Sequence, residues 1–254
     1  MKFVKYHGLG NDFVIVDADV EKNIDFRAIA RQVCDRHFGI GADGLVPIRK
    51  LAERTWQMRI FNADGSECEM CGNVTRCVAH FLGIHGVINL ETLAGTIRPE
   101  LRQDETVRVD MGKPVPGEIV TLNGFEGMNV SMGNPHFVVF VDDLGKIDLT
   151  ADGRALEVHS YFPNKSNIEF VKVLSPDRVR MRVWERGCGI TMACGTGSCA
   201  ALVAGAQRGL TGRQAVVKLD GGELEIEWNQ TNGHVYMTGP AVRVFEGNYH
   251  VANQ

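Results

Sequence analysis

Two short stretches, Met70-Cys71-Gly72-Asn73 and Ala193-Cys194-Gly195-Thr196, share a Cys-Gly pair and lie 123 residues apart. The same shift of 123 residues aligns two further pairs of stretches, Gly10-Asn11 with Gly133-Asn134 and Met58–Asn62 with Met181–Glu185. Three matches in one order at one offset indicate an internal duplication. We therefore predict two homologous halves, residues 1–115 carrying Cys71 and residues 116–254 carrying Cys194.

The pattern of secondary structure favours an α+β fold. Short β-rich runs broken by Gly, Asn and Asp alternate with a few helical stretches. Helices are expected over Asp25–Phe38, Val74–Ile84, Ala151–Tyr161 and Gly197–Arg208, the first with an Asp at its N-cap. Strands are expected over Phe3–Tyr6, Phe13–Asp17, Trp56–Asn62, Val107–Met111, Phe137–Val141, Ile168–Val173, Val179–Glu185, Leu224–Trp228 and Val235–Met237.

Composition and charge point to a globular protein that binds small solutes. The 254 residues include 27 Lys and Arg against 31 Asp and Glu, a net charge of −4, and show no basic stripe for nucleic acid. The uncharged stretch 187–207 contains five glycines together with Thr and Ser, too polar for a membrane span. The N-terminus lacks a signal-peptide pattern. We expect a cytoplasmic protein without nucleic-acid or membrane partners.

The seven cysteines do not suggest a disulfide framework. Their number is odd, and the chain is long and lacks a secretory signal, so reduced thiols are expected. A zinc site could begin at Cys68-x2-Cys71, but no second Cys pair or spaced His pair completes four ligands. No metal is expected.

The chemistry of the duplicated cysteines follows from their position before a helix. The first backbone N–H groups of a helix are unpaired and partly positive, which lowers the pKa of a nearby thiol and attracts a carboxylate. Two such helix starts facing one another across a cleft would place an amino-acid α-carbon between Cys71 and Cys194. One thiolate would remove the α-proton and the opposite thiol would return one, which is racemisation or epimerisation without a cofactor.

The alternative interpretation is that these cysteines are small buried apolar residues, as most cysteines are. The duplicated context favours catalysis for Cys71 and Cys194. Packing remains the interpretation for Cys68, Cys77, Cys188 and Cys199, because none of these four has a counterpart in the other half.

Several polar residues lie beside these landmarks at strand ends and turns. Single Asn residues are common in turns and are weak evidence alone. Glu185 and Arg186 could hold a distal ammonium and carboxylate of a substrate, and His136 could relay protons for a cysteine.

Motifs along the whole chain resemble the diaminopimelate epimerase family. They are His7–Phe13, Phe61–Ser66, Met70–Asn73, Met132–His136, Trp184–Gly187 and Ala193–Gly197. The resemblance implies two pseudo-symmetric halves, each a mixed or antiparallel sheet wrapped around a central helix, with the active site between them. The tail from about residue 241 would pack back on the first half, in a homodimer without a cofactor.

The resemblance also implies roles for individual residues. Cys71 and Cys194 would be the acid and base, assisted by His136 and Glu185. Substrate contacts would fall at Asn11, Gly44, Asn62, Gly72, Asn73, Asn134, Asn167, Glu185, Arg186, Gly195 and Thr196. Three positions depart from the family pattern: Val74 replaces a Gly, Gly44 a Gln, and Phe245 a Tyr at the expected dimer contact.

The function expected from this resemblance is conversion of L,L-diaminopimelate to the meso form, a step towards lysine and peptidoglycan precursors. Two alternatives stay open. One is a pyridoxal-independent racemase of another amino acid, such as histidine. The other is a binding protein on the same scaffold that has lost catalysis.

Overall fold

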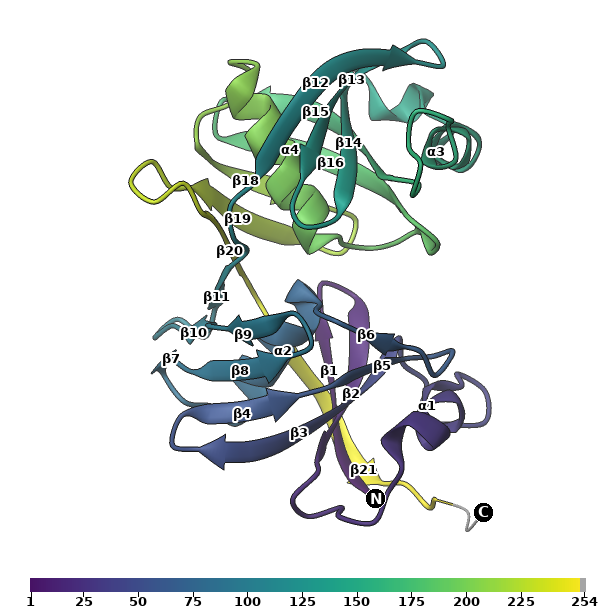
Figure 1. Ribbon diagram of the computed structural model, residues 1–254, viewed down its shortest axis with the longest axis vertical. Helices are drawn as coiled ribbons and strands as arrows, with labels where there is room; N and C mark the ends of the chain where they lie inside the picture. Colours follow the sequence, from purple (N-terminus) through teal and green to yellow (C-terminus); the bar gives the residue numbers. More distant parts are fainter. Residues whose placement is uncertain (252–254) are drawn as a thin grey trace. The chain divides into compact units, whose positions relative to one another are not determined.

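The computed structural model describes residues 1–251 and forms two compact units (Figure 1). Unit 1 comprises Met1–Val109 together with the segment from Gly239 onward, and unit 2 comprises Asp110–Thr238. The chain leaves unit 1 within β11 (Val107–Asp110) and returns to it within β20 (Val235–Gly239).

Unit 1 is built on one mixed sheet whose first strand in spatial order comes from the end of the chain. The order is β21 (Val242–Asn248), β1 (Lys2–Gly8), β2 (Asn11–Asp17), β3 (Gly44–Ala52), β4 (Thr55–Met58), β8 (Asn89–Thr92) and β9 (Gly95–Ile97). Shorter strands are β5 (Ile60–Asn62), β6 (Glu67–Cys68), β7 (Gly86–Val87) and β10 (Glu100–Leu101), and the helices are α1 (Phe26–Cys34) and α2 (Gly72–Leu82). Figure 1 shows β21 alongside β1, as the register of Lys2 with Asn248 requires.

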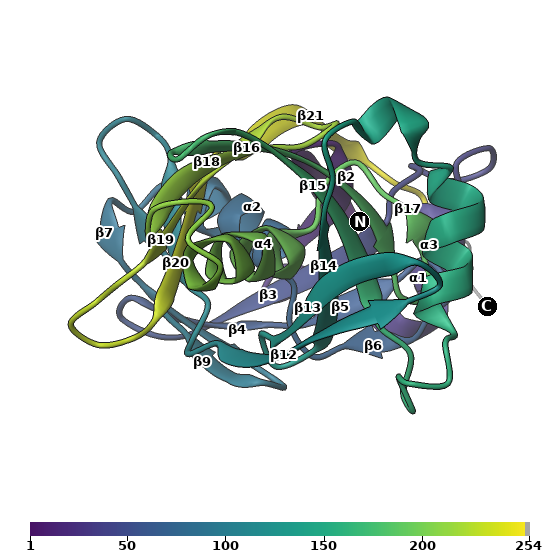
Figure 2. The same ribbon diagram turned by 90° about the horizontal axis from the view of Figure 1, so that it is seen from above.

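Unit 2 repeats this plan around a longer helix. The order is β12 (Val115–Leu122), β13 (Phe125–Ser131), β14 (Pro135–Phe140), β15 (Asn167–Ser175), β16 (Arg178–Glu185), β18 (Gln214–Lys218), β19 (Glu223–Trp228) and β20. The remaining elements are the 3-10 turn η1 (Leu144–Lys146), α3 (Leu149–Glu157), β17 (Gly189–Ile190) and α4 (Gly195–Gln207). Figure 2 shows α4 enclosed by strands of its own unit, and it contacts β13, β14, β15, β16, β18 and β19.

The two sheets match pair by pair, which confirms the predicted duplication. β2 and β3 are parallel with Phe13 opposite Gly44, and β14 and β15 are parallel with His136 opposite Asn167, each number higher by 123. Antiparallel pairs flank both, β1 with β2 and β3 with β4 in unit 1, β13 with β14 and β15 with β16 in unit 2. The α+β class is also confirmed.

Local side-chain chemistry sets the ends of the helices. Asp25 caps α1 as predicted, accepting hydrogen bonds from the N–H groups of Arg27 and Ala28. The predicted C-terminal end at Phe38 is wrong, because α1 stops at Cys34. The Asp35 carboxylate accepts from the N–H groups of His37 and Phe38 and turns the chain there.

Other predicted boundaries differ in similar ways. The strand predicted over Trp56–Asn62 is two strands, because the N–H of Arg59 bonds the carbonyl of Pro47 outside the regular ladder. The helices predicted from Val74 and Gly197 begin two residues earlier, directly after the cysteines.

Each unit has its own core. Unit 1 packs α1 against the sheet through Phe3, Val14, Ile29, Leu45 and Phe61, and unit 2 packs Phe137, Leu156, Ile168 and Phe170. Among residues 1–251, no helix combines the length and the apolar character needed to span a bilayer.

Candidate active site

The first half-site is built at the start of α2. Cys71 is the N-cap residue with extended backbone, half-buried, and its carbonyl accepts from Thr75 Oγ1 at 3.0 Å. Gly72 and Asn73 open the helix and are buried. The leading N–H groups of α2 therefore lie next to this thiol, as the sequence predicted for a helix start.

A chain of side-chain hydrogen bonds orients two predicted substrate contacts in this unit. The fully buried Arg76 donates to Asn73 Oδ1 at 2.9 Å, and Asn73 Nδ2 donates to Asn11 Oδ1 at 3.1 Å. Asn11 Nδ2 in turn donates to Asp43 at 2.5 Å, and Arg36 pairs with the same carboxylate at 2.7 Å. The side-chain amides of Asn73 and Asn11 therefore each accept a hydrogen bond at Oδ1 and donate one from Nδ2, which fixes their orientation.

Two departures from the family pattern have structural explanations here. Val74 lies inside α2 with no exposed surface and without positive φ, so its β-branched side chain is accommodated. Gly44 is buried opposite Asn62 in the register of β3 and β5, and a Cβ there would lie 3.0 Å from the carbonyl oxygen of Phe61. Asn62 itself is exposed and bonds Ser66.

The second half-site repeats this geometry at the start of α4. Cys194 is the N-cap residue, 4% exposed, and its carbonyl accepts from Ser198 Oγ at 2.8 Å. Its sulfur accepts from the N–H of Gly197 at 3.4 Å and lies 3.6 Å from Thr196 Oγ1. The bond from Asn134 Nδ2 to Thr196 Oγ1, 3.3 Å long, repeats the Asn73–Asn11 bond of unit 1 between equivalent positions.

The electrostatics of Cys194 differ from the prediction. Burial raises the pKa of the Cys194 thiol well above its usual range, and the carboxylates of Glu185 and Glu169 raise it further. The Gly197 N–H and the Thr196 hydroxyl act in the opposite direction but are outweighed. The helix start therefore lowers the pKa of the Cys194 thiol as expected, but burial outweighs this effect, and the net shift favours the neutral thiol.

Glu185 faces that thiol directly. Burial raises the pKa of Glu185, while hydrogen bonds from the Thr191 hydroxyl and the Cys194 thiol lower it in part. A carboxyl group with a raised pKa next to a thiol with a raised pKa is suited to exchange a proton with it.

The remaining predicted residues of unit 2 lie on β14 and β15 and directly after β16. Asn167 donates to the carbonyl of Pro135 at 2.8 Å and accepts from the N–H of Arg186 at 2.9 Å. The Arg186 side chain is exposed and bonds the carbonyl of Asn164. His136 is buried, with Nδ1 2.7 Å from Glu169 and Nε2 3.0 Å from Asn134 Oδ1.

Sequence reasoning missed three charged residues that organise these half-sites: Glu169, Arg76 and Asp43. Glu169 interrupts the apolar run Ile168-Glu169-Phe170-Val171 of a predicted strand, and Arg76 lies on the inner face of a predicted helix. The sequence did contain a signal for Glu169 and Arg76: each is a charged residue at a position that the hydrophobic pattern assigns to the core.

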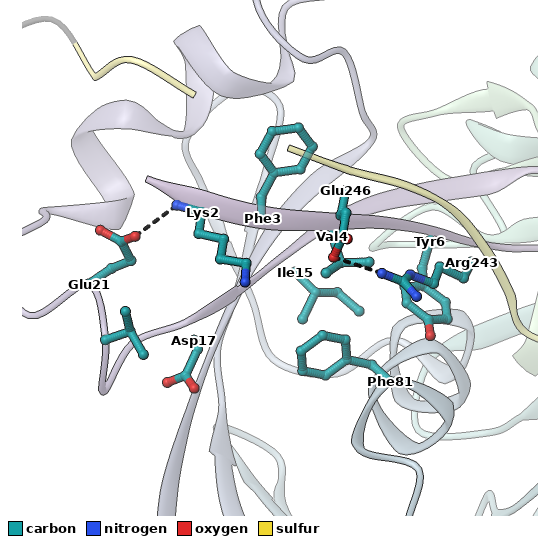
Figure 3. A pocket seen from close by; sticks show the side chains of 11 residues that line it. Lys2, Phe3, Val4, Tyr6, Ile15, Asp17, Glu21, Phe81, Arg243 and Glu246 are labelled. Atoms are coloured by element: carbon teal, nitrogen blue, oxygen red, sulfur yellow. Dashed lines mark hydrogen bonds and ion pairs between the residues drawn. The ribbon is translucent and has the colours of Figure 1, made fainter. Parts of the chain in front are cut away.

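A cavity of about 400 Å³ in unit 1 is lined by none of the predicted site residues (Figure 3). It lies among β1, β2 and β21, with Phe81 of α2 and the paired side chains of Arg243 and Glu246 at its wall. Within residues 1–251, no group of three or more His, Cys, Asp or Glu side chains is placed to hold a metal ion.

Solved structures share this fold over nearly the whole chain. A phenazine biosynthesis protein of the PhzF family from Bacillus anthracis matches with a TM-score of 0.78 at 16% identity, covering 99% of both chains. A hydroxyproline epimerase from Agrobacterium vitis matches with a TM-score of 0.71 at 16% identity, covering 97% of this chain and 90% of that one. At such identities the likeness concerns the fold alone.

Sequence comparison identifies the family. The profile described as diaminopimelate epimerase matches residues 3–116 and 128–244. Proteins named diaminopimelate epimerase are 50% identical in Desulforudis audaxviator and 49% in Pelotomaculum thermopropionicum, each alignment covering 98% of this chain and 99% of the relative. The chain belongs to the diaminopimelate epimerase family and is an isomerase, as the resemblance implied.

Proposed function

We propose that this protein converts L,L-diaminopimelate to meso-diaminopimelate, in lysine biosynthesis, by moving protons at one α-carbon between Cys71 and Cys194. The name shared by relatives that match along the full chain supports the substrate. The observation that carries the chemistry is the repeated geometry of the two cysteines, each an N-cap residue whose carbonyl is held by a hydroxyl one turn into its helix.

The proposed reaction needs one thiolate and one thiol. The thiolate of Cys71 takes the α-proton, so the Cα–H bond breaks and an S–H bond forms. Cys194, held as a thiol beside Glu185, gives its proton to the opposite face of the carbanion. The first N–H groups of α2 and α4 would stabilise the negative charge that develops on the substrate carboxylate.

The reverse reaction starts from the opposite protonation states. Cys194 must then be the thiolate, and Glu185 is the group placed to receive its proton. Asn11, Asn73, Asn134 and Thr196 would hold the reacting end of the substrate, and Asn167 with Arg186 the distal end. A substrate that carries a second charged amino-acid group at its distal end fits this proposal, because Asn167 and Arg186 would hold that group.

The test is turnover of L,L-diaminopimelate by reduced, pyridoxal-free protein in D₂O, followed by NMR. We expect meso product with solvent deuterium at the inverted centre. Product without deuterium would contradict proton exchange through the thiols. If no meso product forms but another L-amino acid such as histidine is turned over, that amino acid is the substrate and diaminopimelate is not. Binding with neither product nor exchange would indicate a scaffold that has lost catalysis.

Single cysteine variants separate the two-base chemistry from mere binding. Cys71→Ala and Cys194→Ala should each reduce epimerisation by at least a thousandfold, because each removes one of two required proton carriers. Cys188→Ala, at an exposed cysteine without a counterpart in the other half, is the matched control and should keep normal turnover. Near-normal turnover by either of the first two variants would rule out the two-base mechanism.

We also propose that the protein is a homodimer, with β21 at the contact. β21 is the edge strand of the unit 1 sheet among the described residues. It exposes Val242, Val244 and Phe245, each with 44–51% of its surface accessible. Exposed apolar residues on an edge strand are typical of strand-to-strand association.

A further inference from the structure

Glu169 is a carboxylate fully buried in unit 2. Its side chain and that of His136 have no accessible surface, and Oε1 lies 2.7 Å from His136 Nδ1. Within the described chain, Oε2 has no hydrogen-bond partner. Burying a carboxylate in this way is strongly unfavourable unless it is compensated. The family motifs identified in the sequence do not include this residue.

The hydrogen-bond partners of His136 determine which of its ring nitrogens carry a proton. Asn134 Nδ2 donates to Thr196 Oγ1, so its Oδ1 is the atom that faces His136 Nε2 at 3.0 Å. Because an amide oxygen only accepts, Nε2 must carry a proton. A carboxylate facing a bare Nδ1 at 2.7 Å would set two lone pairs against each other. A second proton therefore lies between Glu169 and His136.

The first turn of α4 is shaped to admit this carboxylate. A Cβ at Gly197 would lie 2.6 Å from Glu169 Oε1 and 3.2 Å from Cys194 Sγ. The equivalent positions of the first repeat, 123 residues earlier, are Val46 and Val74, which are both fully buried and apolar. The acid and the glycine that accommodates it therefore occur together, and only in the second repeat.

We propose that Glu169 is a positioning residue that holds the proton on His136 and, through it, the orientation of the Asn134 amide. The chain of bonds runs from Glu169 through His136 and Asn134 to Thr196, whose hydroxyl lies beside Cys194. This role rests on the proposed function, in which Asn134 and Thr196 contact the substrate. Without the acid, His136 can present a bare Nε2 to Asn134, and the amide rotates away from its binding orientation.

The test uses Glu169→Gln, which keeps the shape of the side chain and removes its charge and acidic proton. NMR of ¹⁵N-histidine-labelled wild type at pH 7.5 should show His136 with a proton on Nε2 and a far-downfield proton shared at Nδ1. Glu169→Gln should abolish the downfield signal and shift the Asn134 side-chain amide resonances. The matched control is Glu157→Gln, at another buried carboxylate of unit 2 that bonds Trp184 and the Gly187 N–H. Glu157→Gln should leave both the downfield His136 proton signal and the Asn134 side-chain amide resonances unchanged.

Kinetics separate a positioning role from a structural one. Glu169→Gln should fold with a melting temperature close to wild type and raise KM about tenfold, the effect of one lost hydrogen bond to a charged group. Unchanged KM and kcat, or unchanged Asn134 resonances, would overturn the proposal. If wild type fails to turn over diaminopimelate, the proposed function fails by itself, and the NMR comparison still decides whether Glu169 sets the Asn134 amide.

Discussion

Val74 and Gly197 occupy the same place in the two repeats, three residues after each cysteine, and their surroundings explain the difference. Val74 is fully buried inside α2, whereas a Cβ at Gly197 would lie 2.6 Å from Glu169 Oε1. Gly197→Ala in a helix should gain about 0.5–1 kcal/mol from conformational entropy. Here we expect a net loss of stability in urea unfolding, because the methyl group displaces the carboxylate. A gain of stability would contradict the close approach.

Val74→Gly gives the reciprocal prediction. Glycine would match the family pattern at this position, yet it removes a buried isopropyl group and adds backbone entropy to α2. The free energy of unfolding should fall by about 3 kcal/mol. Thermal and urea unfolding measure it, and Val74→Ala, with a smaller loss, is the control. An unchanged or increased stability would show that valine strains the helix.

Two buried thiols should make stability fall at high pH. Burial raises the pKa of Cys34 and of Cys77 to about 12, from 9.0. Raised values mean that the stabilisation is complete below pH 9 and is lost as the pH rises from 9 towards 12. Between pH 8 and 10.5 each thiol should cost about 2 kcal/mol of unfolding free energy. Urea unfolding of wild type against a Cys34→Ala, Cys77→Ala double variant measures the difference, and equal slopes with pH would contradict it.

At the scale of elements, β21 completes a sheet whose other strands lie far away in sequence. Unit 2 places β12 beside β13, whereas unit 1 has β21 in the equivalent place beside β1. Lys2 and Phe3 pair with Asn248 and Gly247, so the strand that follows residue 241 belongs to the unit 1 sheet.

Removal of β21 should therefore destabilise unit 1. A chain ending after Ala241 keeps the bond from Arg76 Nε to the Pro240 carbonyl but exposes β1. We expect its melting temperature to fall by more than about 10 °C, since about 3 kcal/mol corresponds to that shift at this chain length. Hydrogen exchange should be faster in β1 and β2 than in β15 and β16. Equal protection in the two sheets would argue against the role of β21.

The sequence predicted what depends on repetition and periodicity, and missed what depends on tertiary packing. The helix starts at Cys71 and Cys194 and the equivalence of the two repeats were visible in the motifs and the offset. The strand β12 was not visible, because its apolar and polar residues are mixed and nearly all of them are exposed. Glu169 and Arg76 lie at positions that periodicity assigns to the core, but their hydrogen-bond partners come from other elements, which the sequence pattern does not show.

At the scale of the molecule, the repeats share a backbone plan but differ in the charged residues near their cysteines. α2 has the buried cation Arg76 one turn beyond Cys71, and α4 has the carboxylates Glu169 and Glu185 around Cys194. The equivalent of Arg76 in the second repeat is Cys199. A symmetric fold thus places different charged residues near the two cysteines, although the proposed reaction uses each of them both as thiol and as thiolate.

The proposed dimer gives the prediction at this scale. A two-fold contact through β21 would cover Val242, Val244 and Phe245 of both copies, and the Phe245 ring already packs edge-on against Phe3 within its own chain. Phe245→Glu should repel its copy across the axis while β21 keeps its pairing with β1. We expect light scattering after size exclusion to give twice the mass of 28.0 kDa for wild type and the single mass for the variant.

Phe245→Tyr is the control, because it restores the hydroxyl typical of the family and keeps the ring. Its mass should equal that of wild type. A monomeric wild type would end the proposal, and a dimeric Phe245→Glu variant would move the contact away from β21. Because Phe245 also packs on Phe3, the melting temperature of the variant must be measured as well. A monomer that unfolds at the wild-type temperature would show that association depends on this strand and that the fold of unit 1 does not depend on association.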